Sequence, residues 1–354
     1  MSDTIKILYV DDDIENFNDL KDVLNGKTIN GYEITIDSET YFEHAVEKSL
    51  EYNLIILDLF KGNAMSGGVD KGSAIYDSIR SSIFVPIIFY SANPASVAHL
   101  RSQVLGVANK LDDIESLLSE IERLTKHNLP LLKGKVHAFI EDEFKKYFWG
   151  TIQPKNNIFK PEADDLSLGY MLLRNMADTL SRDNIRQLLG DDTIKEDKVH
   201  PMEFYIYPTD TTTEYQTGEI IKNKETDEIF VILTPSCDFI KRGTSERKVD
   251  HILLLKTILL TETKEYKRYN KDKDKYTESL KQFINSSKGD RYFFLPQTPF
   301  IENRVIDFQN KEIVSYEQLC ANFERRAKLD NPYAQSMLAT YTRYYNRIGF
   351  PDID

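Results

Sequence analysis

The sequence predicts an α/β domain with a doubly wound parallel five-stranded sheet, followed by an α+β domain with a small antiparallel β-barrel and flanking helices. In residues 1–125, short apolar runs alternate with segments of helical apolar spacing, which is typical of a parallel sheet covered by helices on both faces. From about residue 201 the pattern changes to short β-rich runs separated by polar turns, which favours a small antiparallel barrel. We therefore expect three parts: residues 1–125, a helical connector over 126–195, and a β-rich domain with C-terminal helices over 196–354.

Short apolar runs mark the expected strands of the first domain. They cover residues 6–10, 32–36, 54–57, 85–90 and 107–108. Apolar spacing of three and four residues predicts the helices between and after them. The helices cover residues 16–24, 42–50, 73–80, 95–104 and 112–124.

The later segments are predicted from the same patterns. Residues 131–149 and 166–189 have helical spacing. Residues 263–291 are rich in Lys, Asp and Tyr, which indicates an exposed helical insertion or a mobile loop within the β-rich part. Residues 314–328 and 332–347 are expected to close the domain as two helices.

Composition and charge exclude several classes of protein. The chain has 354 residues and a net charge of −12, of which residues 1–125, with 10 Lys/Arg and 21 Asp/Glu, carry −11. A DNA-binding output domain usually shows a basic face, so the nearly neutral remainder disfavours nucleic acid as a partner. No apolar run approaches the roughly 18 residues needed to cross a membrane, and two cysteines are too few for a disulfide framework. We therefore expect a cytoplasmic protein.

Five polar residues fall at the ends of expected strands. They are Asp11, Asp12, Asp58, Ser91 and Lys110. Ligands of such sheets bind at the carboxyl ends of the strands, so these side chains are expected to meet there. Three converging carboxylates repel one another and favour a bound cation, and oxygen ligands suit Mg²⁺. Aspartates after strands are also common turn and N-cap residues, but the ordered set of acids, hydroxyl and lysine favours a site.

The runs YVDDD, LIILDL, FYSA and NK, in this order, resemble the receiver domain of two-component response regulators over about 120 residues. The resemblance implies a CheY-like (flavodoxin-like) fold and a Mg²⁺ site. By it, Asp12 is a direct metal ligand, Asp11 holds the ion mainly through water, and Asp58 is a further ligand. The backbone carbonyl of Phe60 is the remaining protein ligand that the resemblance implies.

The same resemblance implies phosphorelay signal transduction. Asp58 is then the phosphoacceptor, Ser91 supplies a hydroxyl to the phosphoryl oxygens, and Lys110 supplies an ammonium group. The donor is a histidine kinase or a phosphotransfer protein, and the chain is a phosphoprotein. An aspartate carboxylate is a competent nucleophile for this transfer, and Mg²⁺ and a lysine neutralise the transferring charge.

The sequence departs from the receiver pattern at three places. The stretch between Asp58 and Gly72 is about six residues longer than usual and rich in glycine. Val107 stands where an aromatic residue is expected, and Leu111 stands where a proline is expected. These departures put the usual coupling between hydroxyl and aromatic residue in doubt. Asp13 is an additional solvated acid or a helix cap.

The second part leaves two hypotheses open. It resembles, more vaguely, an SH3-like barrel, which favours an output domain that binds an unknown partner protein. Alternatively it is a receiver-regulated enzyme such as a nuclease or another hydrolase, in which Cys237 acts as a thiolate with His200 or His251 as its base. Against this, Pro235 and Ser236 indicate a turn with Cys237 half buried.

The aromatic stretch at residues 341–345 could stack nucleic-acid bases, but packing against the core is the more common use of such a stripe. Self-association into a homodimer is also open.

Overall fold

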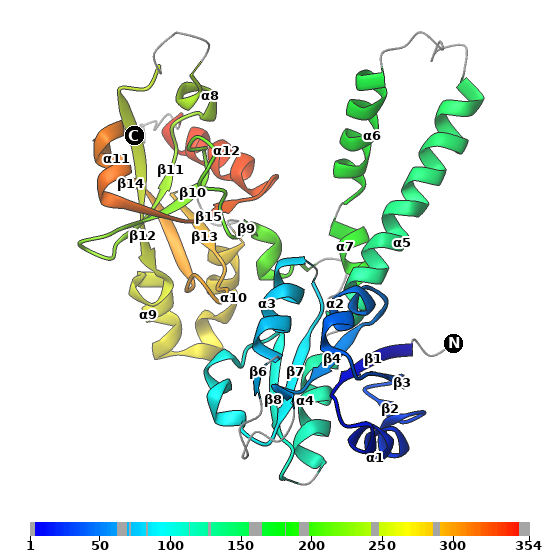
Figure 1. Cartoon of the computed structure of the whole chain (residues 1–354). Coiled ribbons are helices and arrows are strands. Elements are labelled where there is room, and N and C mark those ends of the chain that lie inside the picture. Colours follow the sequence, from blue (N-terminus) through cyan, green and yellow to red (C-terminus); the bar gives the residue numbers. More distant parts are fainter. Residues whose placement is uncertain are drawn as a thin grey trace, which may run out of the picture. The chain divides into compact units, whose positions relative to one another are not determined.

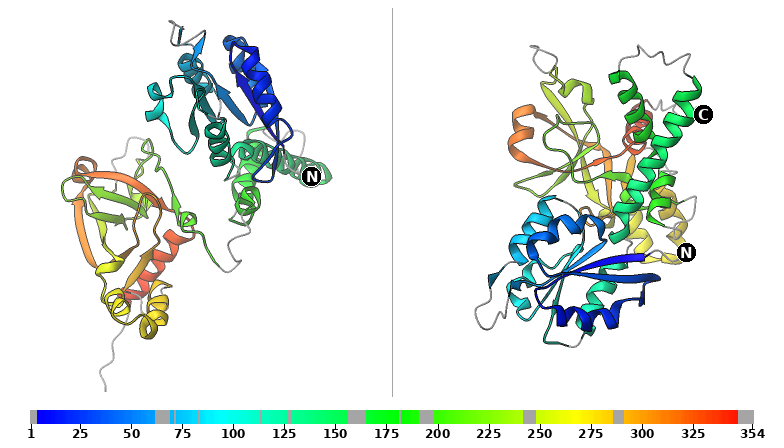
Figure 2. Two further views of the ribbon diagram at one scale, coloured as in Figure 1. Left: turned by 90° about the horizontal axis from the view of Figure 1, so that it is seen from below. Right: turned by 45° about the vertical axis from the view of Figure 1, so that its right-hand side comes forward.

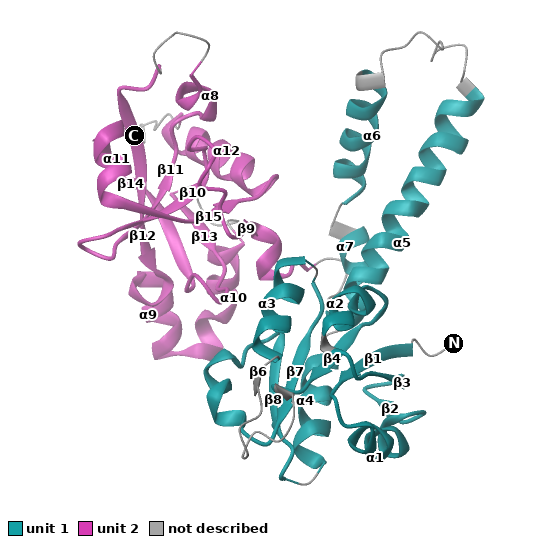
Figure 3. Cartoon of the chain, viewed as in Figure 1, with its two compact units in different colours: residues 1–192 teal, residues 193–354 magenta. Residues whose placement is uncertain are grey.

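The computed structural model describes residues 4–61, 69–70, 72–82, 84–112, 114–126, 129–155, 165–180, 182–190, 198–241, 248–285 and 291–346. The chain divides into two compact units, Met1–Asp192 and Thr193–Asp354 (Figure 3). Unit 1 contains a mixed, mainly parallel sheet and unit 2 an antiparallel sheet (Figure 1). In the part of the chain that the structure describes, no helix is both long and apolar enough to span a membrane.

Five parallel strands form the body of the first sheet, as predicted. They are β1 (Thr4–Val10), β3 (Tyr32–Glu39), β4 (Leu54–Leu57), β7 (Ile87–Ser91) and β8 (Leu105–Asn109). A short antiparallel strand, β2 (Thr28–Ile29), extends one edge and gives the order β2-β3-β1-β4-β7-β8. The first strand thus lies in the interior of the sheet, with the chain winding to both sides of it.

Both faces of this sheet are buried, because alternate residues of each strand point to opposite sides. Ile7 and Tyr9 of β1 pack in one core with α1 (Ile14–Leu24) and α4 (Glu115–Thr125). Leu8 of β1 packs in the other core with α2 (Ala45–Lys48) and α3 (Gly72–Ser82). The arrangement of helices about the sheet is seen in Figures 1 and 2.

The helix predicted over residues 95–104 is wrong. The structure has two short 3-10 turns there, Pro94–Ser96 and Ala98–Leu100. The apolar side chain of Val97 is buried. Beyond it, a tertiary contact fixes the chain, because Arg101 donates two hydrogen bonds to the buried carboxylate of Glu120 on α4. The prediction over 42–50 is confirmed only in part, because α2 is flanked by the 3-10 turns Phe42–His44 and Ser49–Glu51.

Three α-helices follow the sheet in the part of unit 1 that the structure describes. α5 (Leu129–Tyr147) continues into a π-helical turn, Phe148–Ile152, and a 3-10 turn, Gln153–Lys155. α6 (Asp165–Thr179) and α7 (Arg182–Leu189) complete the set, so the helices predicted over 131–149 and 166–189 are confirmed. Leu131 at the start of α5 packs against the sheet core, which joins the helix to the receiver-like part.

Seven strands form the sheet of unit 2. They are β9 (Tyr205–Ile206), β10 (Glu219–Asn223), β11 (Ile229–Ile232), β12 (His251–Leu259), β13 (Tyr292–Leu295), β14 (Arg304–Ser315) and β15 (Phe323–Leu329). Their order is β13-β14-β12-β11-β10-β15-β9, and all pairings are antiparallel, as predicted.

The pairing register shifts within β10 and within β12, and irregularities of this kind bend a strand. Tyr205 on edge strand β9 donates a hydrogen bond to the carbonyl oxygen of Pro296, just beyond the other edge strand, and shares a buried cluster with Leu295. The two edges therefore approach each other through side chains. Closure of the sheet into a barrel stays a prediction.

Within the described residues of unit 2, five α-helices accompany this sheet, together with the 3-10 turns Pro201–Phe204 and Leu260–Glu262. They are α8 (Ser236–Phe239), α9 (Lys264–Lys271), α10 (Lys273–Ile284), α11 (Tyr316–Asn322) and α12 (Tyr333–Tyr345). α9 and α10 confirm the helical insertion, which is held by Leu280 and Phe283 against Val305. α12 confirms the last predicted helix.

The closing helix predicted over 314–328 is wrong. Only α11 is helical there, and it is followed by β15. Phe323, Ala327 and Leu329 are the buried residues of β15, so the apolar spacing of this stretch belongs to a strand with period two.

Candidate functional site: an acidic cluster at the carboxyl edge of the parallel sheet

Three carboxylates meet at the carboxyl ends of two neighbouring strands. Asp11 and Asp12 follow β1 and Asp58 follows β4, where the backbone N–H of Asp58 donates to the carbonyl oxygen of Val10 at 2.9 Å. One oxygen from each of the three carboxylates lies within 4.8 Å of the others. Asp11 and Asp58 are buried and Asp12 is exposed. The structure therefore brings together the three acids that the sequence singled out.

Lys110 lies between two of these acids. Its Nζ is 2.6 Å from Oδ2 of Asp11 and 2.8 Å from Oδ2 of Asp58. The lysine follows β8, and its backbone N–H donates to the carbonyl oxygen of Ser91 at 3.0 Å, which ties it to the end of β7. The ammonium group thus neutralises part of the negative charge of the cluster.

Burial and charge pull the pKa values of this cluster in opposite directions. Burial raises the pKa of Asp58, and the attraction of Lys110 offsets this only in part. Burial alone would lower the pKa of Lys110, but the charges of Asp58 and Asp11 outweigh it and raise the pKa above its ordinary value. The lysine is therefore held in its charged form by the two acids that it joins.

Two side chains that the sequence did not single out also bind Asp11. The hydroxyl of Tyr9 donates to Oδ2, and Nδ2 of Asn16 donates to the same oxygen at 3.3 Å. Burial, followed by the charge of Asp11, raises the pKa of Tyr9, so it remains a donor. Oδ1 of Asp11 accepts the backbone N–H of Asp13 at 3.0 Å. A signal for Tyr9 exists in the sequence, because it lies two residues before Asp11 and so on the same face of the strand.

The other predicted site residues occupy the same edge of the sheet. Ser91 is buried at the end of β7, and its Oγ accepts the backbone N–H of Asn93 at 3.3 Å. Phe60 begins β5 (Phe60–Lys61), which pairs with β6 (Val69–Asp70), so the long loop begins and ends as a two-stranded ribbon. The rest of that loop lies outside the described residues. Asp13 caps α1 by accepting the N–H of Glu15 at 2.9 Å, which confirms its expected use as a cap.

Gly72 allows the close approach of α3 to the acidic cluster. A Cβ at this position would lie 2.3 Å from the carbonyl oxygen of Asp58 and 2.6 Å from Cα of Leu59. Real Cβ atoms do not come so near to backbone atoms. Glycine is therefore required where the helix begins, next to Asp58.

The two departures from the receiver pattern have different surroundings. Val107 on β8 is half buried and packs against the core that contains α3. Leu111 is 70% exposed. Neither side chain has a hydrogen-bonding group, so neither can take part in the polar cluster.

The donor set fits a hard divalent cation. Each of the three carboxylates offers an oxygen atom within 4.8 Å of the others, and Asp12 is exposed to solvent, where an ion keeping several waters can bind. Mg²⁺ would be held by Asp12, Asp58 and Asp11, and it would neutralise charge on phosphoryl oxygens. The individual ligand roles stay predictions.

In unit 2, the structure does not bring the proposed thiolate and its base together. Cys237 is exposed on α8, with Sγ 3.7 Å from the adjacent carboxylate of Asp238. His200 accepts the N–H of Met202 at the start of a 3-10 turn, and His251 is exposed at the start of β12. Within the described ranges, no hydrogen bond joins Cys237 to either histidine. The cysteine is more exposed than the half-buried turn position that was the alternative expectation.

The aromatic stretch near the C-terminus packs on the sheet. Tyr344 is buried against Phe308, and Tyr341 lies edge-on to the same ring. Tyr345 is partly exposed and donates to the carbonyl oxygen of Phe308 at 2.8 Å. These contacts match the packing alternative for this stretch.

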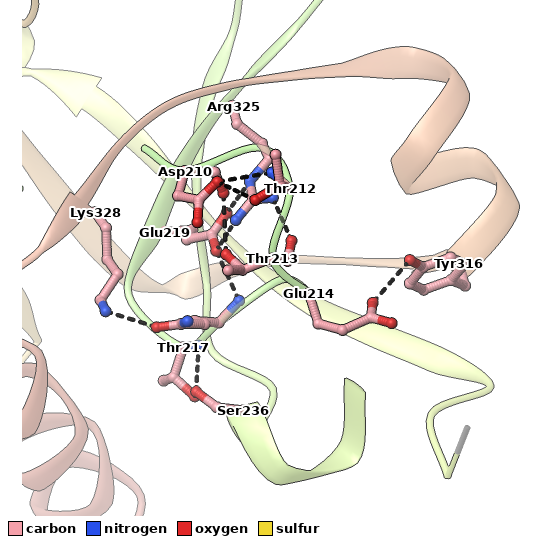
Figure 4. Close-up of polar contacts among 11 residues, drawn as sticks. Asp210, Thr212, Thr213, Glu214, Thr217, Glu219, Ser236, Tyr316, Arg325 and Lys328 are labelled. Atoms are coloured by element: carbon pink, nitrogen blue, oxygen red, sulfur yellow. Dashed lines mark hydrogen bonds and ion pairs between the residues drawn. The ribbon is translucent and has the colours of Figure 1, made fainter. Parts of the chain in front are cut away.

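The polar centre of unit 2 is a buried ion pair between neighbouring strands. Arg325 of β15 donates from Nε and Nη2 to the two oxygens of Glu219 of β10, at 2.7 and 2.6 Å. Its Nη1 donates to the carbonyl oxygen of Thr213 at 2.7 Å, and the guanidinium lies over the ring of Tyr215. Figure 4 shows the arginine joining strand β10 to the loop that precedes it. These groups satisfy one another, which indicates a structural use.

Comparison with known proteins gives a limited result. No family model matches the chain, and no curated protein matches it. Among solved structures, it aligns with a two-component transcriptional regulator AraC from Clostridium phytofermentans at 19% identity, covering 38% of this chain and 99% of that chain, with a TM-score of 0.29.

Two further alignments are of the same kind. The N-terminal domain of the lantibiotic response regulator NsrR aligns at 18% identity, with 34% of this chain and 96% of that chain covered and a TM-score of 0.27. The chemotaxis protein CheY4 from Vibrio cholerae aligns at 21% identity, with 34% and 98% covered and a TM-score of 0.25. The chain is thus similar, over about a third of its length, to response regulators, and at these TM-scores only the geometry of its own residues can carry a functional argument.

Proposed function

We propose that residues 1–125 are a receiver domain that accepts a phosphoryl group on Asp58 in a Mg²⁺-dependent reaction, and that this modification controls unit 2 as an output domain. The observation that carries the proposal is the cluster of Asp11, Asp12 and Asp58 within 4.8 Å, with Lys110 joining two of the acids. A parallel sheet places this cluster at its carboxyl edge, where ligands of such sheets bind.

The reaction is the transfer of a phosphoryl group from a donor to a carboxylate oxygen of Asp58. A carboxylate oxygen of Asp58 attacks the phosphorus of a phosphodonor, a new O–P bond forms, and the bond from phosphorus to the donor's leaving atom breaks. Oδ1 of Asp58 accepts the N–H of Leu59 at 2.7 Å and Oδ2 faces Lys110, so the carboxylate is held in a fixed orientation. Lys110 can exchange its contact with Asp58 for the phosphoryl oxygens, and Ser91 offers a hydroxyl at the neighbouring strand end.

The direct test is intact-mass measurement after incubation with acetyl phosphate. With Mg²⁺, the parent chain should gain the mass of one phosphoryl group, and with a chelator it should gain none. Asp58→Asn should gain none in either condition. Asp37→Asn is a matched control, because Asp37 lies near the end of the neighbouring strand β3 outside the cluster. Labelling of Asp58→Asn at the parent level would overturn the proposal.

The physiological phosphodonor is proposed to be a histidine kinase or a phosphotransfer protein. Its recognition requires access to Asp58, and Asp12 and the adjacent surface of α1 are exposed at that edge. Phosphoryl transfer from a purified, autophosphorylated kinase to the parent chain, but not to Asp58→Asn, would support this. Failure with every kinase of the source genome would contradict it.

Control of unit 2 requires that phosphorylation reach the helices beyond the sheet. Four residues separate Lys110 from the start of α4, and α5 is anchored to the sheet core by Leu131. A ligand shifts a two-state element only by its differential affinity for the two states, so the phosphoryl group must move Lys110 or Ser91 to be felt there. Hydrogen exchange with and without beryllofluoride should change across residues 100–150 and in unit 2. Changes confined to the acidic cluster would show a docking module and not a switch.

A further inference from the structure

Tyr9 is a buried tyrosine whose hydroxyl meets the acidic cluster from inside the sheet. It lies in β1 with no exposed surface, and its ring stacks on Phe17 of α1 with centroids 6.4 Å apart. The hydroxyl donates to Oδ2 of Asp11. A phenylalanine would fill the same space and make the same ring contact, so packing alone does not account for the hydroxyl group.

Asp11 is the acid of the cluster with the largest number of described donors. Oδ2 accepts from Tyr9, from Asn16 and from Lys110, and Oδ1 accepts from the N–H of Asp13. Of these donors, the ammonium group of Lys110 is the one that also donates to Asp58. A shared ammonium group cannot hold Asp11 fixed if it turns towards a phosphoryl group.

We propose that Tyr9 is a positioning residue, which holds Asp11 in the orientation that the Mg²⁺ site needs both before and after Lys110 turns to the phosphoryl oxygens. This inference rests on the proposed function of the acidic cluster. Its physical basis is that hydrogen bonds to metal-ligating carboxylates fix their orientation, and the loss of such a partner typically costs about 10–100-fold in metal affinity. Tyr9 comes from the strand itself, so its position is fixed by the sheet and does not depend on whether the phosphoryl group is present.

The test compares Tyr9→Phe with Tyr52→Phe in the full chain. Tyr52 also donates its hydroxyl to an aspartate, Asp37, at 3.1 Å, but this pair lies outside the cluster. Mg²⁺ binding is measured by isothermal titration calorimetry, a readout that does not depend on phosphoryl transfer. We expect the dissociation constant to rise about tenfold or more in Tyr9→Phe and to be unchanged in Tyr52→Phe.

A double-mutant cycle shows whether Tyr9 acts through Asp11. In an Asp11→Asn background, adding Tyr9→Phe should have little further effect on Mg²⁺ affinity, because the carboxylate that Tyr9 orients is gone. An equal effect in both backgrounds would overturn the inference. Asn16→Ala is a second variant, at a half-buried position of α1, and it should weaken Mg²⁺ binding in the same direction.

The outcomes separate this inference from the proposed function. If the parent chain binds Mg²⁺ and Tyr9→Phe binds it equally well, the positioning role is overturned and the phosphoacceptor site stands. If both tyrosine variants lose affinity equally, the effect is general to the fold, and the positioning role is again overturned. If the parent binds no Mg²⁺, the proposed function itself fails.

Discussion

Replacement of Arg325 by leucine should strongly destabilise unit 2. The side chain of Glu219 has no exposed surface, and the side chain of Arg325 is only 8% exposed. The substitution removes two charge-assisted hydrogen bonds to Glu219 and one to the carbonyl oxygen of Thr213. Of the described hydrogen bonds to the Glu219 carboxylate, the one from the backbone N–H of Gln216, at 2.8 Å, would remain.

The magnitude follows from the burial of the charge that remains. Breaking a buried ion pair by removing one partner typically costs about 3–5 kcal/mol, because the other charge is left without compensation. Burial already raises the pKa of Glu219 against the opposing effect of Arg325, and without the arginine it should rise further. An acid whose pKa is higher in the folded state takes up a proton on folding, so the destabilisation should be largest near pH 7 and should shrink as the pH falls through the raised pKa.

Hydrogen exchange with mass spectrometry is the suitable assay, because it reports on each unit separately. Peptides from β10 and β15 should lose roughly two to four orders of magnitude of protection, whereas peptides from β1 should be unchanged. Arg326→Leu is the matched control, since this neighbouring arginine has 38% of its side chain exposed and pairs with Glu324 at 3.2 Å. It should cost at most about 1 kcal/mol.

Two results would refute the reasoning. If Arg325→Leu and Arg326→Leu destabilise unit 2 equally, burial of the pair is not the cause. If the double variant Glu219→Leu with Arg325→Leu is no more stable than Arg325→Leu alone, the uncompensated carboxylate is not the source of the cost, because an apolar pair should remove that penalty.

Three further outcomes are expected. Gly72→Ala should lower the free energy of unfolding by about 1–3 kcal/mol and slow phosphoryl acceptance, because its Cβ would overlap backbone atoms next to Asp58. Gly134→Ala, whose Cβ would have nothing within 4 Å, should not destabilise the chain. Thermal melts and phosphorylation rates of the two variants would check this. Asp12→Ala should weaken Mg²⁺ binding in calorimetry more than Asp13→Ala, and equal losses would mean that the register of the acidic run is misread. Lys110→Ala should lower the melting temperature measured in the presence of a chelator. The melting temperature should also depend more strongly on Mg²⁺ than in the parent, because the ion alone then compensates the charges of Asp11 and Asp58. An unchanged Mg²⁺ dependence would contradict this.

The parallel sheet and the positions of its polar residues follow from local pattern. Each strand is a short run that is buried on both faces and is therefore apolar throughout, so β1, β4 and β7 are visible in the sequence. The carboxyl ends of parallel strands share one edge, so Asp11, Asp58 and Lys110 meet once the strand order is known. The pairings of β1 with β4 and of β7 with β8 realise this order.

The local pattern was insufficient where tertiary contacts determine the backbone. Residues 95–104 have the spacing of a helix, but Pro94 begins a 3-10 turn and Arg101 is drawn to Glu120, which is 19 residues away. Residues 314–328 combine a strand end, a helix and a strand, and β15 is extended because it pairs with β10. Strand pairing joins residues about 100 positions apart, and no window of local spacing contains that information.

The sequence by itself determined which residues lie at the carboxyl edge of the first sheet, because burial and alternation are properties of short segments. Only the tertiary structure decided how each charge there and in unit 2 is compensated. Tyr9 and Lys110 both reach Asp11, and Arg325 reaches Glu219 across a strand pairing. A buried charge is stabilised by the partners that come within hydrogen-bond distance of it, and those partners are brought there by packing and not by nearness along the chain.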